Sequence, residues 1–286
     1  MPGLMETSRK LIKEIFLPRS KTSKKGDYGK LLVVGGSDKY TGSAALVSLA
    51  AYSAGCDLVL NAAPKRAADT MASFSPEIIT HPLNGDYLKK EHVKIILNLA
   101  DWADAVVIGN GLGTEKNTMD AVVGIISKTK KPIVVDADGI KSFPPKKHKI
   151  LAGKDVIITP HSYEMSVFSG KKIDTDLQKR IDLCKDLANS LKITIILKGN
   201  VDVIAADGKV AINKTGNSYM TVGGTGDTLA GICGSLLARG VDNFSSASAA
   251  TMLNGLAGDL CAKEWGEGLT ASRMIDYIPK AIMSAV

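Results

Sequence analysis

Short apolar runs recur along the chain, and each ends in glycine, proline or histidine. Both faces of these runs are apolar and polar residues follow them, which is the pattern of strands buried in a parallel sheet. Amphipathic helical stretches lie between the runs, most clearly at residues 176–191. This alternation predicts a doubly wound α/β sheet. The predicted strands span residues 31–36, 57–64, 105–111, 133–139, 156–161 and 194–199.

A different pattern follows at residues 201–206 and 209–213, two β-prone runs separated by Asp207-Gly208. This dipeptide is a strong hairpin signal, so we expect a small antiparallel edge. The chain then becomes helical again. The candidate helices span residues 228–239, 245–263 and 272–284.

The composition fits one globular domain over residues 1–286, because 45% of the residues are hydrophobic and 23% are charged. We expect the first 20 residues to form a leading helix or arm. The cysteines lie far apart in the sequence, which fits a reducing cytoplasm better than a disulfide framework. The uncharged runs are too short for a membrane span, and we recognise no secretory signal.

The charge balance is the first pointer to a ligand, since 36 Lys+Arg against 29 Asp+Glu give a formal net charge of +7. Such an excess is compatible with nucleic acid, anionic lipid or small anions. Aromatic residues make up only 5% of the chain, and the basic residues are scattered without a recognisable binding motif. We therefore expect no nucleic-acid and no membrane partner, and a basic nucleic-acid-binding module is a remote alternative.

Glycine-rich segments offer more specific candidates. Gly109, Gly111 and Gly113 follow a predicted strand, but the third glycine of a Rossmann fingerprint would fall at Thr114. Residues 36–43 lack the lysine of a P-loop and carry Thr41 where that motif needs glycine. Both of these nucleotide-binding motifs are therefore disfavoured.

The strongest signal is a run of small residues that passes directly into an apolar helix: Gly223, Gly224, Thr225 and Gly226. Free backbone N–H groups at such a helix start make an anion hole for a phosphate. Asp227 comes next, and its carboxylate could accept the proton of a hydroxyl that attacks a phosphoryl group. A first-turn aspartate stabilised by the helix dipole fits equally well, so both interpretations stay open.

Further polar groups follow the predicted strands, where an open α/β sheet binds its ligands. Asp136 and Asp138 follow one strand, and His161 and Glu164 follow the next. Mg²⁺ prefers few carboxylates and several waters. Glu164 is therefore a candidate to hold Mg²⁺ through water.

As an ordered set, these motifs resemble those of the ADP- or ATP-dependent NAD(P)H-hydrate dehydratases of the ribokinase-like superfamily. The resemblance covers residues 24–279. It rests on Gly35-Gly36-Ser37 with Tyr40 and Gly42, Gly109 to Gly113, Asp136-Ala137-Asp138, Thr159-Pro160-His161 with Glu164, Leu197-Lys198-Gly199, and Gly223 to Asp227.

The resemblance implies a ribokinase-like three-layer α/β fold, with a mostly parallel central sheet, helices on both faces and a small antiparallel edge. It also implies a lyase that repairs the hydrated coenzymes NADHX and NADPHX. A nucleotide would phosphorylate the C6 hydroxyl of the hydrated ring, and elimination of phosphate would restore NADH or NADPH. The cosubstrate would be ADP or ATP with Mg²⁺, and ADP, the usual choice of prokaryotic-type members, would leave AMP.

The resemblance also assigns each motif a role. Asp227 would be the base on the substrate hydroxyl, beside an anion hole made by Gly223, Gly224, Thr225 and Gly226. The hydrated coenzyme would lie against Ala44, Gly111, His161 and Asp227. The adenine nucleotide would be held by Lys198, Gly199, Asn200, Val201, Asp202 and Gly226. Glu164 would occupy the place of the glutamate that organises metal and phosphate.

This chain departs from the family pattern at three places. Asn110 stands where proline is usual, Ser162-Tyr163 replace a common Pro-Gly, and Asp202 replaces a common threonine. None of these changes removes the proposed base. Asp202 adds a negative charge beside the expected nucleotide.

Members of this family commonly self-associate, so we expect a homo-oligomer. The epimerase domain that is often fused to such a domain has no room in this chain, so a separate epimerase would cooperate with it. The nearest alternative is a kinase of the same superfamily, of the hydroxyethylthiazole or hydroxymethylpyrimidine kinase type. Such an enzyme would use the same anion hole and aspartate but stop at the phosphoester.

Overall fold

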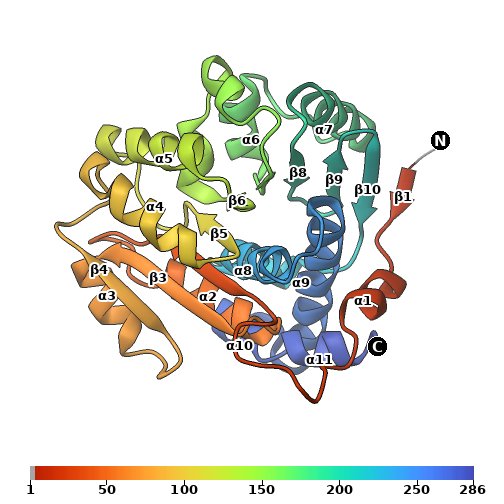
Figure 1. Cartoon of the computed structure of the whole chain (residues 1–286). Helices are drawn as coiled ribbons and strands as arrows, with labels where there is room; N and C mark the ends of the chain where they lie inside the picture. Colours follow the sequence, from red (N-terminus) through yellow and green to blue (C-terminus); the bar gives the residue numbers. More distant parts are fainter. Residues whose placement is uncertain (1–3) are drawn as a thin grey trace.

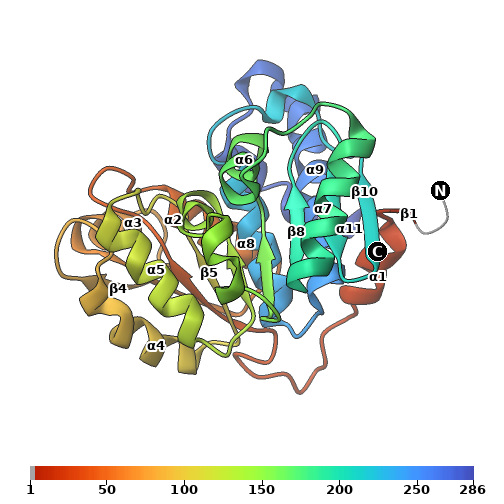
Figure 2. The same cartoon turned by 90° about the horizontal axis from the view of Figure 1, so that it is seen from above.

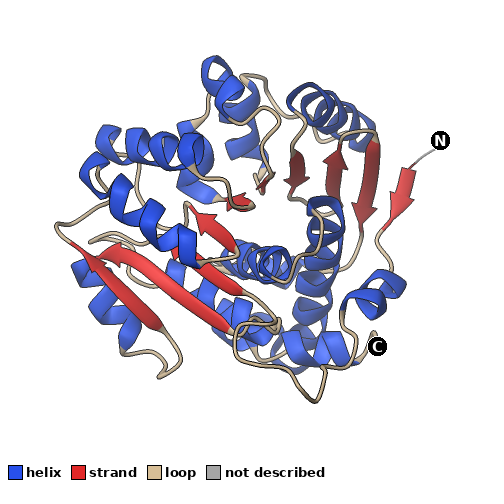
Figure 3. Cartoon of the chain, viewed as in Figure 1, coloured by secondary structure: helices blue, strands red, loops and turns tan. Residues whose placement is uncertain are grey.

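The predicted strands join in a ten-stranded sheet in the computed structural model, which describes residues 4–286. Figure 3 shows the strands in red among the helices in blue. The strand order is β1-β10-β9-β8-β7-β6-β5-β2-β3-β4. The strands span Leu4–Glu6 (β1), Lys30–Val34 (β2), Leu58–Pro64 (β3), Ile79–Leu83 (β4), Ala105–Ile108 (β5), Ile133–Val135 (β6), Val156–Ile158 (β7), Thr194–Leu197 (β8), Asp202–Ala206 (β9) and Lys209–Asn213 (β10).

Most of the sheet is parallel, with antiparallel strands near one edge. Strands β2 to β8 all run parallel to their neighbours among themselves. Strand β9 runs antiparallel to both β8 and β10, which confirms the hairpin around Asp207-Gly208. Strand β1 then pairs parallel with β10, with Leu4 opposite Val210. The leading segment therefore contributes a strand, and β1 rather than the hairpin is outermost on this side.

Helices cover both faces of the sheet (Figures 1 and 2). Leu31 and Val33 of β2 face a core shared with α1 to α3 and α8 to α11, whereas the alternate residues Leu32 and Val34 face a core shared with α4 to α7. The helices span Arg9–Ile15 (α1), Ser43–Ser53 (α2), Lys65–Ala72 (α3), Val93–Trp102 (α4), Lys116–Lys128 (α5), Ser162–Ser169 (α6), Leu177–Leu191 (α7), Thr225–Ala238 (α8), Asn243–Trp265 (α9), Ala271–Ile275 (α10) and Ile278–Met283 (α11).

The predicted helices are mostly confirmed. Helix α7 begins at Leu177 because Asp176 caps it, accepting the Lys179 N–H at 2.9 Å. Helices α8 and α9 each begin two or three residues before the predicted start. The prediction of one helix over 272–284 is wrong, because Pro279 lies in the first turn of α11, where a proline starts a helix rather than continuing one. Among residues 4–286, no helix is long and apolar enough to cross a membrane.

The apolar-run pattern missed strand β4. This strand contains His81 and Pro82, and several of its residues are only partly buried. It lies at the edge of the sheet and pairs with β3 alone. An edge strand tolerates proline because one of its sides forms no ladder hydrogen bonds.

The strand order reverses at β2, which lies between β3 and β5. Open α/β sheets bind ligands at the carboxyl ends of the strands, near such a switch point. The segments that follow β5, β6 and β8 carry Asn110, Asp136 and Lys198, and these side chains contact one another. The fold thus gathers the predicted strand-end groups beside the start of α8.

Candidate functional site

The glycine segment before α8 turns sharply into the helix. Gly224 precedes the first turn with φ +97, and a Cβ there would lie 2.6 Å from Leu46 Cδ1 and 2.8 Å from Ala271 Cβ. Only glycine fits this position without strain. Within the described chain, no side chain caps the start of α8. The first N–H groups of the helix therefore have no side-chain acceptor, which is the condition for binding an anion there.

Asp227 lies in the first turn of α8, and its carboxylate accepts none of the backbone hydrogen bonds of the helix start. Its Oδ1 accepts a hydrogen bond from Asn110 Nδ2 at 2.6 Å. Its Oδ2 faces the glycine segment, 4.0 Å from the position that a Cβ on Gly224 would occupy. The carboxylate thus lies beside the free N–H groups and does not cap them, which favours the chemical interpretation over the capping one.

Asn110 connects two acids. Its Nδ2 also donates to Asp136 Oδ2 at 2.8 Å, so one carboxamide bridges Asp136 and Asp227. Asn110 and Asp136 are both about 1% exposed. Gly109, just before Asn110, has φ +132, and a Cβ there would collide with the carbonyl oxygen of Asp136. Close packing of the two strand ends therefore requires glycine at this position.

Lys198 is the cation of the site. Its ammonium lies 3.0 Å from Asp136 Oδ1 and 3.9 Å from Glu164 Oε2. The Thr159 hydroxyl donates to the same Asp136 oxygen at 2.6 Å. Burial alone would lower the pKa of Lys198, but the charges of Asp136 and Glu164 outweigh it and raise that pKa.

The environment of Asp227 moves its pKa toward neutrality. Burial, followed by the charge of Asp136, raises the pKa of this carboxyl to about 7, against smaller opposing effects of Asn110, Lys198 and Ser43. A carboxyl group tuned in this way can exchange a proton with a substrate near neutral pH.

His161 and Glu164 form the start of α6. The Tyr163 N–H donates to His161 Nδ1 at 3.1 Å, and the His161 N–H donates to Glu164 Oε2 at 2.9 Å. Because Nδ1 accepts, a neutral His161 carries its proton on Nε2, which lies 3.2 Å from Glu164 Oε1. Burial raises the pKa of Glu164, and the nearby Lys198 opposes that effect. The His161 side chain remains about half exposed and open to a ligand.

Two predicted substrate contacts lie beside Asn110. A Cβ on Gly111 would approach Tyr40 Cβ to 2.9 Å and Ser43 Cβ to 3.2 Å, so the loop after β5 packs on the start of α2. Ala44 is fully buried in α2. Ser43, at the start of α2, also lowers the pKa of Asp227.

Arg180 of α7 holds the backbone of the predicted nucleotide segment, residues 198–202. This buried guanidinium donates to the carbonyl oxygens of Leu197 at 3.2 Å and Val201 at 2.9 Å. Asp202 folds back on the segment and accepts the Gly199 N–H at 2.9 Å. Burial raises the pKa of Asp202. The structure thus gives Asp202 a role in shaping the loop.

The acids of the site do not fit a directly bound metal ion. Asp136 and Glu164 both face the Lys198 ammonium, so a protein cation already compensates them. No group of three or more His, Cys, Asp or Glu side chains among residues 4–286 is arranged to hold a metal. Binding of Mg²⁺ by Glu164 through water stays a prediction.

Comparison with known proteins decides the family. The model of the NAD(P)H-hydrate dehydratase family matches residues 31–280. This chain belongs to that family. The chain is also 35% identical to the ADP-dependent (S)-NAD(P)H-hydrate dehydratase of Cenarchaeum symbiosum, over 93% of both chains. It spans about half the length of the bifunctional NAD(P)H-hydrate repair enzymes that it also matches.

Solved structures confirm the fold. The ADP/ATP-dependent NAD(P)H-hydrate dehydratase of Bacillus subtilis, co-crystallised with ATP/Mg²⁺, superposes with a TM-score of 0.84 at 26% identity over the whole of both chains. A ribokinase-like superfamily protein of Enterococcus faecalis gives a TM-score of 0.85 at 23% identity, covering 100% of this chain and 98% of its own. The expected ribokinase-like fold is therefore confirmed.

The sequence motifs did not identify two residues that support the site, Thr159 and Arg180. Thr159 was part of a motif, but its hydrogen bond to Asp136 follows only from the meeting of two strand ends. Arg180 had a visible signal, since it lies one turn before Cys184 beside the apolar stripe of α7, where a charged residue needs buried partners.

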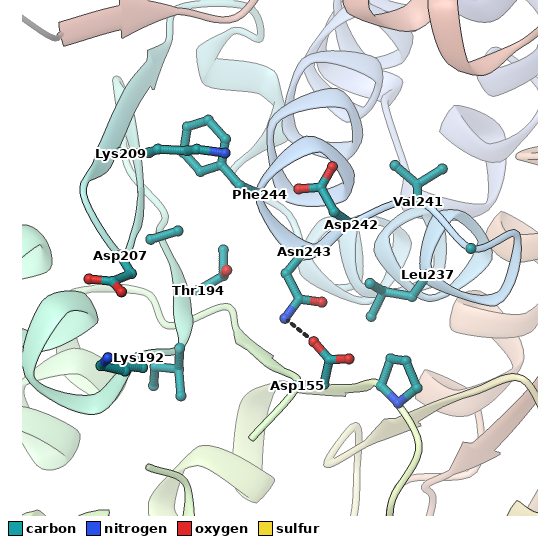
Figure 4. A pocket seen from close by; sticks show the side chains of 14 residues that line it. Asp155, Lys192, Thr194, Asp207, Lys209, Leu237, Val241, Asp242, Asn243 and Phe244 are labelled. Atoms are coloured by element: carbon teal, nitrogen blue, oxygen red, sulfur yellow. Dashed lines mark hydrogen bonds between the residues drawn. The ribbon is translucent and has the colours of Figure 1, made fainter. Parts of the chain in front are cut away.

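A separate hollow of about 430 Å³ opens at the amino ends of strands β6 to β8 (Figure 4). Asn243 and Asp155 face each other across it and form a 2.9 Å hydrogen bond. None of the residues that line it belongs to the predicted site. The predicted site lies at the carboxyl ends of the strands, away from this hollow.

Proposed function

We propose that this chain dehydrates (S)-NAD(P)H-hydrate at the expense of ADP or ATP, as a repair enzyme for nicotinamide coenzymes. The observation that carries the proposal is the placement of Asp227. Its carboxylate lies beside an uncapped helix start, one oxygen is held by Asn110, and the other faces Gly224. The family membership of the chain and the names of its relatives support the same activity.

The first chemical step is a phosphoryl transfer. Asp227 takes the proton from the C6 hydroxyl of the hydrated ring, and the hydroxyl oxygen attacks the terminal phosphoryl group. The bond to the leaving nucleotide breaks, which releases AMP from ADP or ADP from ATP. The backbone N–H groups of Gly223, Gly224, Thr225 and Gly226 stabilise the negative charge on the transferred group.

The second step is an elimination. The C6–O bond breaks and phosphate leaves with its electron pair. The proton on the neighbouring ring carbon passes to water, and the C–H electron pair forms the ring double bond of NADH or NADPH. The N–H groups that bound the phosphoryl group remain beside the leaving phosphate. A kinase of the same fold would release the phosphoester before this step.

The polar groups around Asp227 divide between the two ligands. Lys198 lies beside Gly226, with its Nζ 3.2 Å from the position of a Cβ there, so it can meet the transferred phosphate. We assign the nucleotide to residues Lys198, Gly199, Asn200, Val201, Asp202 and Gly226. The hydrated coenzyme then lies against Gly111, His161 and Asp227, whereas Ala44 is fully buried and offers no surface for a direct contact.

Magnesium would enter with the nucleotide, since Mg²⁺ is commonly held by substrate phosphates and a few carboxylates. The B. subtilis relative was co-crystallised with ATP/Mg²⁺. Glu164 is the carboxylate that would reach such an ion through water. The steps assigned above to Asp227 and the glycine segment do not depend on this contact.

The remaining expectations stay predictions: a single catalytic domain, a homo-oligomer, a cytoplasmic location and a separate epimerase that converts the other epimer of the substrate. ADP is the expected cosubstrate, as in the name of the C. symbiosum relative.

The test is a coupled measurement on purified NADHX and NADPHX with ADP or ATP and Mg²⁺. We expect the absorbance of the reduced nicotinamide to return and phosphate to be released in equal amount. Accumulation of a phosphorylated substrate without recovered absorbance would support the kinase alternative. No turnover with either nucleotide would contradict the proposal.

A further inference from the structure

We propose that Asn110 is a positioning residue for Asp227, whose carboxamide holds one carboxylate oxygen so that the other faces the glycine segment and the substrate hydroxyl. This inference rests on the proposed function, because it assigns to Asn110 the orientation of the proposed base. Asn110 itself touches neither the glycine segment nor a reacting atom in the assignment above.

The carboxamide geometry supports this role. A carboxamide has two N–H donors, and here one goes to Asp136 Oδ2 at 2.8 Å and the other to Asp227 Oδ1 at 2.6 Å. Both donors therefore point to acids from different elements, since Asp136 follows β6 and Asp227 lies in the first turn of α8. Asp136 is anchored by Thr159 and Lys198, so it fixes the carboxamide against which Asp227 is aligned.

The orientation of the Asn110 amide leaves its oxygen without a hydrogen bond within the described chain. Asn110 Oδ1 is buried and has no hydrogen-bond partner among the described residues. Rotating the amide would turn Oδ1 toward two carboxylates and remove both donors from them. An orphaned buried acceptor requires an explanation, and satisfying two acids with one amide provides it.

The backbone of Asn110 is also fixed. Its carbonyl oxygen accepts the Gly36 N–H at 2.8 Å, and a Cβ on Gly35 would lie 2.6 Å from the same oxygen. The loops after β2 and β5 are thus locked together at the switch point of the sheet. A side chain on such a rigid backbone can hold a catalytic group in one orientation.

Asn110 also affects the charge of Asp227. The charged groups that act on it are Asp136 after β6 and Lys198 after β8, and the neutral Ser43 of α2 also lowers its pKa. The hydrogen bond from Asn110 lowers the pKa of Asp227, opposing burial and the charge of Asp136. Without this donor, less of the base is ionised at neutral pH. Proline, the residue of the family pattern, offers no such donor.

The variants Asn110→Leu and Asn110→Ala test the role, and Ala covers the case in which the larger side chain prevents folding. We expect the acidic limb of the kcat–pH profile to move up by about one pH unit, since a hydrogen bond to a charged group is lost. Near pH 6 this corresponds to roughly tenfold slower turnover. In parallel, ¹³C NMR of labelled aspartate carboxyls, with Asp227→Asn to assign the signal, follows the titration of Asp227 without any substrate.

Asn61→Leu is the matched control. Asn61 of β3 is also fully buried. Its amide oxygen accepts a hydrogen bond from Ser48 of α2, and its amide nitrogen donates to the carbonyl oxygen of Ile79 in β4. We expect this variant to lose stability with an unchanged titration of Asp227. If the Asn110 variants also titrate as the wild type does, the inference is overturned, whether or not they are less stable. Because the NMR titration needs no turnover, a failure of the proposed dehydratase activity would be recognised separately.

Discussion

The ammonium of Lys198 lies 3.0 Å from Oδ1 of Asp136, and both side chains are largely buried. The two aspartates that Asn110 bridges therefore have different environments. Asp136 is paired with a cation, whereas Asp227 accepts its hydrogen bond from the neutral amide of Asn110. Environments that separate two acids in this way assign them different roles, one structural and one as proton acceptor.

Removing the cation should expose this arrangement. In Lys198→Met, the buried carboxylates of Asp136 and Glu164 lose their common partner, so we expect a loss of about 2–4 kcal/mol in the free energy of unfolding at pH 8. The loss should shrink toward pH 5, because burial raises the pKa of Glu164 and its carboxyl can then take up a proton. Denaturant unfolding at both pH values measures it.

Lys179→Met is the control for that change. Lys179 forms a shorter pair with Asp174, 2.7 Å apart, but both side chains are exposed. We expect no measurable change in Tm. Equal effects of the two substitutions would mean that the Lys198 pair contributes no more than a surface pair.

Asp227 should lower stability at the pH where it acts. Its pKa is raised from 3.8 to about 7, so the folded state holds a proton that the unfolded state has released between these values. The stability that Asp227 contributes is therefore present at low pH and lost as the pH rises through 7. Asp227→Asn should unfold with a free energy higher by about 2–4 kcal/mol at pH 8 and by much less at pH 5.

Asp242→Asn provides a control of opposite sign. Asp242 caps α9, and its hydrogen bonds with Ser245 outweigh burial and lower its pKa. This substitution should reduce stability at pH 8 relative to the wild type, because the ionised cap is lost. The prediction for Asp227 is wrong if Asp227→Asn gives the same difference from the wild type at both pH values.

Gly223 and Gly224 should respond differently to alanine. A Cβ on Gly224 meets Leu46 and Ala271 at a positive φ, so Gly224→Ala should cost about 1–3 kcal/mol of stability. A Cβ on Gly223 meets nothing within 4 Å. We therefore expect Gly223→Ala to keep its Tm and to lose kcat/KM, because the methyl group obstructs the phosphate. Measuring Tm and kcat/KM for both variants tests this.

An unchanged kcat/KM in Gly223→Ala would mean that no ligand approaches that backbone. Gly208→Ala in the β9–β10 hairpin serves as the reference, since Gly208 has φ +72 and lies away from the site. It should lose some stability and keep its activity.

Much of the parallel sheet could be predicted from the sequence, because strands such as β2 and β5 are buried on both faces and read as continuous apolar runs. Strand β4 could not, since its edge position allows Pro82 and polar residues in the strand. Pro279 is the sequence signal for the break between α10 and α11, since proline favours the first turn of a helix.

The motifs of the site were also visible in the sequence, but not their contacts. Asn110 and Asp227 are 117 positions apart, and their hydrogen bond exists because the end of β5 meets the start of α8. Asn110 drew attention only as a departure from the family pattern. Its role depends on the direction of two N–H donors, which no spacing or composition can show.

The central claim is that Asp227 accepts the proton of the substrate hydroxyl, and Asp227→Asn tests it most directly. The measurement is kcat for NADHX with ADP at pH 8, together with the Kd for ADP of the same protein. We predict that kcat falls by about 10²–10⁴-fold while the Kd changes little, because only the proton acceptor is lost. A kcat close to that of the wild type would contradict the account and return Asp227 to a structural role.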